Sequence, residues 1–325
     1  HLIKNALNLR ISKKRQTGTL IVGGGLAGIA AAHTLNYNDY LLLELDDRYG
    51  GSSSANDYQG VAVGRGAHYD LAYPANYGAE VLKMFEHLEI IEYQAWSDSW
   101  SFKDRQHLIP AARRQQCFQK GKLRKVVIPK IEASQKLMEV LRPFEDRMIL
   151  PTRLTPVDIQ YLDKMTFNSF LNDQNIDKHP DFRKLIDYQM LDDYGGTSQQ
   201  VSALAGIHYY TCRPYQKQYV ELFSAPEGNQ YFANKIHQQL SSHKILNQHL
   251  VYHIEKKGAG YLVNALDIIQ NQRLEIQTDA IIYAGQKHSL PYIAPKIYSP
   301  FNENVYAPWM VVNILTKQKP NNFGF

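Results

Sequence analysis

The feature that most constrains the fold is a glycine-rich turn between two apolar runs, in residues 19–51, TLIVGGGLAGIAAAHTLNYNDYLLLELDDRYGG. Residues 19–22 form a short, partly β-branched run that is typical of a buried parallel strand. Residues 26–35 are rich in alanine, which favours a helix, and residues 40–45 form a second apolar run. The order strand, turn, helix, strand predicts a βαβ unit and therefore an α/β, Rossmann-like domain.

Three glycines give the turn the spacing G-x-G-x-x-G: Gly23, Gly25 and Gly28. The first permits a tight turn, the second lets the backbone approach a pyrophosphate, and the third lets the helix pack against the strand. The helix N-terminus adds unpaired N–H groups and a partial positive charge. Glu44 follows Gly23 by 21 positions, the offset expected of a carboxylate that binds ribose hydroxyls. The turn therefore predicts a dinucleotide, and the acid disfavours the 2′-phosphate of NADP.

Two further glycine segments follow, DDRYGG at residues 46–51 and GRGAHY at residues 64–69. This arrangement resembles the flavin-containing amine oxidase superfamily, and most closely a bacterial subgroup of FAD-dependent oxidoreductases whose flavin segment reads Gly-Ala-His-Tyr. In that superfamily the second glycine pair contacts FAD phosphate and ribityl groups, and a Gly-Ala segment runs beside the isoalloxazine ring. FAD is longer than one βαβ unit can hold, so a second close backbone approach is needed, and glycine permits it.

The resemblance implies FAD as the cofactor and a set of binding residues drawn from all of these segments. The set is Gly23, Gly25, Leu26, Ala27, Gly28, Glu44, Leu45, Arg48, Gly50, Gly51, Ser52, Gly66, Ala67, His68, Val251, Ala284 and Gly285. Ser52 stands where many members carry arginine. In relatives the backbone at the position of Val251 contacts adenine, and Ala284 and Gly285 approach the flavin. His68 and Tyr69 are the flavin-facing candidates for catalysis, and the alternative is that they only shape the flavin edge.

The rest of the chain divides into a return to the nucleotide domain and an insertion. Residues 76–88 have helical spacing, and residues 90–225 contain no nucleotide motif. A Pro-Glu-Gly turn at residues 226–228, a strand hairpin at 250–254 and 261–263, and a strand at 279–285 resemble the part of the family that completes the sheet. We therefore expect a discontinuous FAD-binding domain, 1–75 and 226–290, and an inserted mixed α+β substrate domain, 76–225 and 291–325.

One helix of the insertion has two interpretations. Thr197 and Gln200 fit a capping box. The small-residue helix that follows ends in His208, Tyr209 and Tyr210, and it is either a pocket wall near the flavin or an ordinary buried helix. In relatives the apolar strand at 310–315 also belongs to the substrate domain. A later Gly-Asp helix start then caps the flavin, and because no such segment is found, we expect the chain to cover only part of the family's length.

Composition narrows the partners. The 325 residues are 44% hydrophobic, enough for a sizeable core, and the mild net charge of +5 does not require a nucleic-acid partner. A basic cluster around Gly121 indicates an exposed hairpin or loop, which we interpret as a solvated face, with an acidic partner or a membrane surface as the alternative. Two cysteines are too few for a metal cluster, so no metal is expected. No apolar run reaches the roughly 18 residues of a membrane helix. The chain opens with His1, so the sequence does not decide its compartment. The two alternatives are the cytoplasm and, after removal of a signal peptide, the periplasm.

The expected function is that of an FAD-dependent, amine-oxidase-like oxidoreductase that transfers a hydride from a substrate carbon to flavin N5. The partner is a small-molecule substrate, with amines the first class to test, and the oligomeric state is open. The same fold also hosts desaturases, isomerases and a mutase. A non-catalytic FAD-binding or partner-binding module is the alternative from another class. An NAD-dependent dehydrogenase rests on the first glycine turn alone, and Gly50 and Gly51 argue against it.

Overall fold

The computed structural model describes residues 4, 9–35, 38–66, 77–110, 117–119, 121–124, 132–149, 151–176, 180–212, 221–297 and 305–314. The chain divides into two compact units, residues 1–69 with 225–305 and residues 70–224 with 306–325. These bounds differ from the expected domain ranges at residues 70–75, 225 and 291–305. That the first unit binds FAD and the second a substrate stays a prediction.

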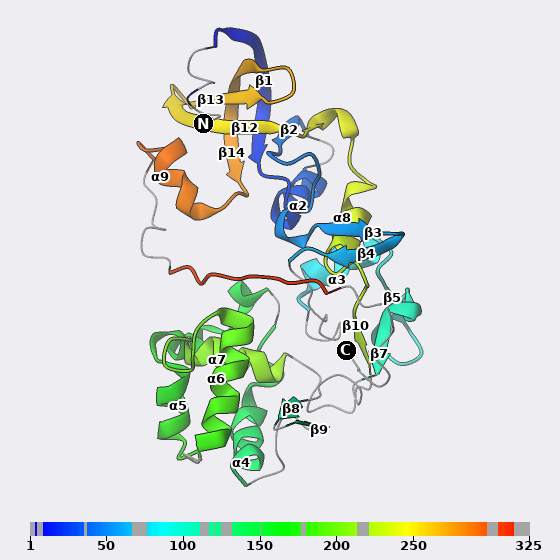
Figure 1. Ribbon diagram of the computed structural model, residues 1–325, viewed down its shortest axis with the longest axis vertical. Helices are drawn as coiled ribbons and strands as arrows, with labels where there is room; N and C mark the ends of the chain where they lie inside the picture. The colour runs from blue at the N-terminus through cyan, green and yellow to red at the C-terminus, as the bar shows by residue number, and fades with distance from the viewer. Residues whose placement is uncertain are drawn as a thin grey trace. The chain divides into compact units, whose positions relative to one another are not determined.

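The first unit is built on a six-stranded sheet with strand order β11-β2-β1-β14-β13-β12, of which Figure 1 labels all strands but β11. Its strands are β1 (Ile11–Val22), β2 (Tyr40–Leu43), β11 (Ile245–Leu246), β12 (His249–Lys257), β13 (Gly260–Asp267) and β14 (Gln272–Tyr283). The pairs β11/β2, β2/β1 and β1/β14 are parallel, whereas β13 runs antiparallel to both β14 and β12. The sheet is thus a parallel Rossmann-like half extended by an antiparallel hairpin.

The apolar run at residues 19–22, from which the fold was predicted, forms the end of β1 in the interior of the sheet. Residues 19–22 pair with β2 on one edge and with β14 on the other, so they are enclosed on both sides. Leu20 and Ile21, whose side chains point to opposite faces of the sheet, are also fully buried. The predicted strands are confirmed, and Glu44 is the first residue after β2. Residues 11–16 of β1 are exposed and mostly polar, and because they carry no apolar pattern the sequence did not indicate this part of the strand.

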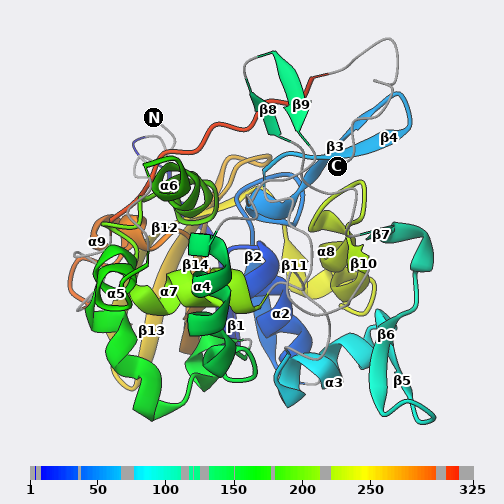
Figure 2. The ribbon, with the colours of Figure 1, turned by 90° about the horizontal axis from the view of Figure 1, so that it is seen from below.

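Two helices and a second hairpin complete the glycine-rich part of the first unit. Helix α2 (Leu26–Thr34) confirms the helix predicted after the first glycine turn. Helix α8 (Gln230–His237) lies beside it in Figures 1 and 2. The hairpin consists of β3 (Ala55–Tyr58) and β4 (Val61–Gly64), and a short helix, α9 (Leu290–Ile293), packs on β12. The predicted Pro-Glu-Gly turn forms before α8, with the Gly228 N–H donating to Ala225 O at 2.9 Å.

The second unit has a helical core and small hairpins (Figure 2). Its helices are α3 (Ala79–His87), α4 (Glu132–Leu141), α5 (Phe167–Asp173), α6 (Pro180–Tyr194) and α7 (Ala203–Thr211). Its strands are β5 (Ile91–Gln94), β6 (Ser99–Phe102), β7 (Leu108–Pro110), β8 (Cys117–Gln119), β9 (Lys122–Arg124) and β10 (Glu221–Phe223). Strands β8 and β9 form the hairpin predicted around Gly121, whose φ is 72°. The unit is therefore mixed α+β, as predicted.

The predicted start of the helix after Thr197 needs correction. Helix α7 begins at Ala203 with Ser202 as its N-cap, and Thr197 with Gln200 closes a separate turn in which the Gln200 N–H donates to Thr197 O at 2.8 Å. The hydrogen-bonding residues were identified correctly, but they cap a turn that precedes the helix. Tyr209 and Tyr210 are buried in the core of the unit, which favours the interpretation of a buried helix.

The apolar segment expected as a strand at 310–315 is not one over its described part. Residues 305–314 adopt neither helix nor strand, and residue 315 lies outside the described residues. A strand needs a neighbour for its N–H and C=O groups, and none of the described strand pairings involves this segment. Apolar composition alone does not supply that neighbour.

Candidate functional site

The first glycine turn is fixed by close backbone packing at the carboxyl ends of β1 and β14. The Gly23 N–H donates to Leu43 O and the Ala284 N–H to Val22 O, each at 2.8 Å. Gly23 has a φ of 104°, which favours glycine. A Cβ on Gly28 would lie 1.8 Å from Gly23 O, so α2 leaves the sheet in a position that only glycine permits. Ala284 and Gly285 lie directly against this turn, and their predicted approach to the flavin stays a prediction.

The second glycine turn is joined to the first by backbone contacts. The Gly50 N–H donates to Gly24 O at 2.9 Å, and Gly25 and Gly50 form a parallel bridge. Gly50 has a φ of 110°, and the chain then enters a short 3₁₀ helix, Gly51–Ser53. The structure thus brings together two glycine segments that are about 25 residues apart in the sequence, and Ser52 lies in the same short helix.

The third glycine segment reaches the same place. The Arg65 N–H donates to Ser54 O at 2.8 Å, and a Cβ on Gly66 would lie 2.7 Å from Ser52 O. Gly66 therefore lies beside the second turn. Ala67, His68 and Tyr69 lie outside the described residues, so their proposed place beside the flavin stays a prediction.

The predicted ribose-binding acid is buried at the edge of the first turn. Glu44 is 8% exposed, and its Oε2 accepts the Gly24 N–H while its Oε1 accepts the Asp46 N–H at 2.7 Å. A carboxylate can accept about four hydrogen bonds, so both oxygens keep capacity for further donors. The two backbone bonds fix the carboxylate where β2 ends, in a suitable place to accept hydroxyl groups.

The remaining predicted adenine and ribose positions lie near Glu44. The His249 N–H donates to Glu44 O at 2.8 Å, so β12 begins at the carboxyl end of β2 and Val251 follows two positions later. The side chain of Val251 is buried in the apolar core with that of Leu43, which leaves only backbone atoms for a ligand. Leu45 is exposed, 51% by relative area, beside the acid.

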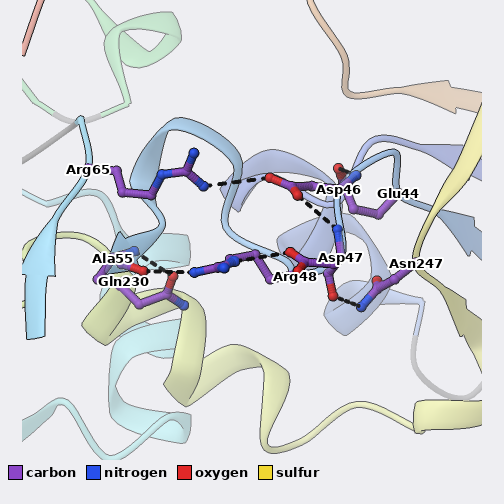
Figure 3. A network of polar contacts seen from close by, with 8 residues as sticks. All are labelled: Glu44, Asp46, Asp47, Arg48, Ala55, Arg65, Gln230 and Asn247. Atoms are coloured by element: carbon purple, nitrogen blue, oxygen red, sulfur yellow. Dashed lines mark hydrogen bonds and ion pairs between the residues drawn. The ribbon is translucent and has the colours of Figure 1, made fainter. Parts of the chain in front are cut away.

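Charged side chains around the second turn form the network in Figure 3. Arg48 binds Asp47 Oδ1 through Nε at 3.1 Å and Ala55 O through Nη1 at 3.3 Å. This hydrogen bond, with the positive charge of Arg48, lowers the pKa of the exposed Asp47 carboxyl group. Arg65 approaches Asp46 with an N–O distance of 3.7 Å (Figure 3). The predicted Arg48 is thus engaged with its own chain at the margin of the site.

Two supports of the site were missed by sequence reasoning. Gln230 Oε1, from α8, accepts the Ala55 N–H at 3.2 Å, and the Asn247 amide donates to Asp47 O at 3.0 Å (Figure 3). Gln230, Asn234 and His237 have helical i, i+4, i+7 spacing, and this spacing of polar residues was the signal that could have indicated Gln230. Asn247 carries no comparable signal, because it lies in a loop.

The geometry fits the phosphates of a dinucleotide. Gly25 has an ordinary φ of −66°, and a Cβ added to it would meet no atom within 4 Å, so the backbone is open to a ligand there. Helix α2 has no side-chain hydrogen bond at its N-cap, which leaves N–H groups of its first turn for an anion. Among the described residues, no group of three metal-ligating side chains could hold a metal ion, and no helix is long and apolar enough to cross a membrane.

Comparison with known proteins agrees with this geometry. Residues 21–88, less than half of the chain, match the NAD(P)-binding Rossmann-like domain family. No curated protein matches the chain by sequence. Wild-type putrescine oxidase bound to putrescine is similar in structure, with a TM-score of 0.58, 15% identity, and coverage of 86% of this chain and 60% of the oxidase.

Two other solved structures show the same likeness. A fatty acid isomerase from P. acnes gives a TM-score of 0.58 at 15% identity, with coverage of 86% of this chain and 61% of the isomerase. Cyclohexylamine oxidase from Brevibacterium oxydans gives 0.56 at 15% identity, with coverage of 85% and 59%. The chain therefore spans about 60% of the length of these structures. Over that span it shares the fold of these structures, and residues 21–88 form a Rossmann-like domain within it.

Proposed function

We propose that this chain binds FAD and acts as an amine-oxidase-like FAD-dependent oxidoreductase. The observation that carries the proposal is the junction of the two glycine turns, in which the Gly50 N–H donates to Gly24 O. A single glycine turn is enough for one pyrophosphate at a helix N-terminus. A second turn joined to it extends the cradle, which suits a longer cofactor that continues beyond the pyrophosphate.

Each segment of the site then has a role in holding the cofactor. The first turn and the N-terminus of α2 would bind the pyrophosphate, Glu44 the ribose hydroxyls, and the Val251 backbone the adenine. Gly66, Ala67, Ala284 and Gly285 would lie along the flavin, with His68 and Tyr69 facing it. When bound, the flavin would accept a hydride at N5 from a substrate carbon beside an amine nitrogen. The chain's own contribution is to bind and orient.

The substrate class rests on structural neighbours. Putrescine oxidase and cyclohexylamine oxidase have names that specify amines, which supports a small-molecule amine as the first substrate to test. The fatty acid isomerase is as similar as the putrescine oxidase, so an isomerase on the same scaffold is the second candidate. Fold alone does not separate the two reactions.

The first experiment is an absorption spectrum of the purified protein from about 300 to 550 nm, followed by chromatography of the cofactor released on denaturation. Two flavin bands and released FAD are expected. A protein that is colourless and takes up no added FAD would contradict the proposal. Amine-dependent oxygen consumption then supports an oxidase, whereas flavin that stays oxidised with every amine favours the isomerase.

A matched pair of variants sharpens this test. Gly25→Ala places a Cβ in open space at the expected pyrophosphate site, so it should fold normally but bind FAD at least about 10-fold more weakly. Gly258→Asn, at the β12–β13 turn, also meets open space, at a φ of 62° that asparagine tolerates, and should bind FAD like the parent. Equal affinity in all three proteins would place FAD elsewhere.

A further inference from the structure

Helix α8 presents a polar stripe to the second glycine turn. Gln230, Asn234 and His237 follow i, i+4, i+7 spacing and therefore share one face of the helix. That face meets the segment from Tyr49 to Ala55, which contains the glycine pair. One face of α8 thus contacts the second glycine turn through its polar side chains.

Both ends of this segment are held by α8. At one end the Tyr49 hydroxyl donates to Asn234 Oδ1 at 3.1 Å, and the Tyr49 ring stacks on His237 with centroids 3.8 Å apart. At the other end Gln230 Oε1 accepts the Ala55 N–H at 3.2 Å. Gln230 Nε2 also donates to Asn234 Oδ1 at 2.8 Å, so the two ends are linked through one amide pair.

Gln230 lies directly against the turn itself. A Cβ on Gly50 would lie 2.9 Å from Gln230 Oε1. On its other side, the Gly50 N–H donates to Gly24 O. Gly50 is therefore enclosed between the first turn and the Gln230 amide, and removing the amide opens one of these two sides.

We propose that Gln230 is a positioning residue for phosphate binding, which acts by holding the second glycine turn against the first. The inference rests on the proposed FAD binding. It assigns a role to a side chain that itself need not touch the cofactor. Asn234 and Tyr49 have a lesser part in the same clamp, because they hold the far end of the segment.

The test compares Gln230→Met, which keeps the length of the side chain and removes its hydrogen bonds, with Gln238→Met, the same change at an exposed glutamine at the end of α8. FAD, ADP and adenosine are titrated into flavin-free protein by calorimetry. Gln230→Met should bind FAD and ADP about 10-fold more weakly, because the lost hydrogen bonds are each of modest strength. Adenosine, which has no phosphate, should bind both variants like the parent.

The outcomes separate the inference from the function on which it rests. If the parent protein binds neither FAD nor ADP, both the proposed function and the inference are contradicted. A parent that binds FAD, with Gln230→Met binding it equally well, overturns the inference alone. Equal losses for FAD, ADP and adenosine, with a lower melting temperature, would show a merely structural role and would also overturn it.

A second variant covers the case in which Gln230→Met does not fold. Tyr49→Phe removes only the hydroxyl that donates to Asn234 and retains a ring that can stack on His237. It should weaken FAD and ADP binding by about two- to fivefold and leave adenosine binding unchanged. Unchanged affinity for FAD in this variant would contradict the clamp.

Discussion

The two glycine turns of the first unit reach the same place by different means. The turn at Gly23–Gly28 is fixed by backbone packing, since a Cβ on Gly28 would collide with Gly23 O. The turn at Gly50–Gly51 is flanked by side chains of α8, and the Cβ of a residue at position 50 would meet the end of a flexible glutamine. The first turn is therefore fixed by backbone contacts with its own helix and with the neighbouring strands. The second also depends on a side-chain hydrogen bond between residues 175 positions apart, Ala55 and Gln230.

The largest effect is expected for Gly28→Ala, because the added Cβ meets backbone that is held by the sheet. Overpacking of this kind costs about 1–3 kcal/mol and sometimes more, so we expect at least about 3 kcal/mol of lost unfolding free energy in urea. Gly25→Ala is the control and should change the unfolding free energy by less than about 0.5 kcal/mol. Equal stabilities for the two variants would remove the steric basis of the comparison.

Glu44→Gln tests the electrostatic part of the first turn. The carboxylate accepts N–H groups from Gly24 and Asp46, and an amide can accept only one of them. The lost charged hydrogen bond should lower the unfolding free energy by about 1.5–3 kcal/mol. Asp57→Asn, which alters an exposed carboxylate bonded to the Gly60 N–H, should cost less than about 1 kcal/mol. The reverse order would show that Glu44 does not stabilise the turn.

Gly50→Ala tests the second turn. Its φ of 110° strains any other residue, and its Cβ would meet Gln230 Oε1, so we expect about 1–2 kcal/mol of destabilisation, less than for Gly28→Ala. In the double variant with Gln230→Ala the added Cβ no longer meets the glutamine. The double variant should therefore lose less unfolding free energy than the two single variants lose together. Strict additivity in chemical denaturation would mean that the glutamine does not press on the turn.

The smallest effect concerns pH. Burial lowers the pKa of His237 below its ordinary value of 6.5, so the unfolded chain takes up this proton more readily than the folded one. Stability from the neutral ring is therefore complete above about pH 6.5 and is lost as pH falls through the lowered pKa. His237→Phe keeps a ring against Tyr49. In this variant the urea midpoint of unfolding should change less between about pH 7 and 5 than it does in the parent. Identical pH profiles would exclude His237 as the cause.

Much of the fold followed from the sequence because the decisive signals are local. The apolar run before Gly23, the alanine-rich helix and the position of Glu44 predicted a βαβ unit, and the structure confirms it. The predicted start of α7 was wrong, because Thr197 and Gln200 can close a turn as well as cap a helix. The catalytic candidates His68 and Tyr69 lie outside the described residues, so they stay predictions.

What the sequence determined by itself is the first glycine turn with its strand, helix and acid, since steric limits on backbone near glycine act within a few residues. Only the tertiary structure decided how the second turn is held, because Gln230, Asn234 and Asn247 reach it across about 200 positions of chain. A hydrogen bond between distant residues leaves no pattern in either segment alone. The sheet and α8 create that proximity, and with it the enclosed backbone site that fits a dinucleotide.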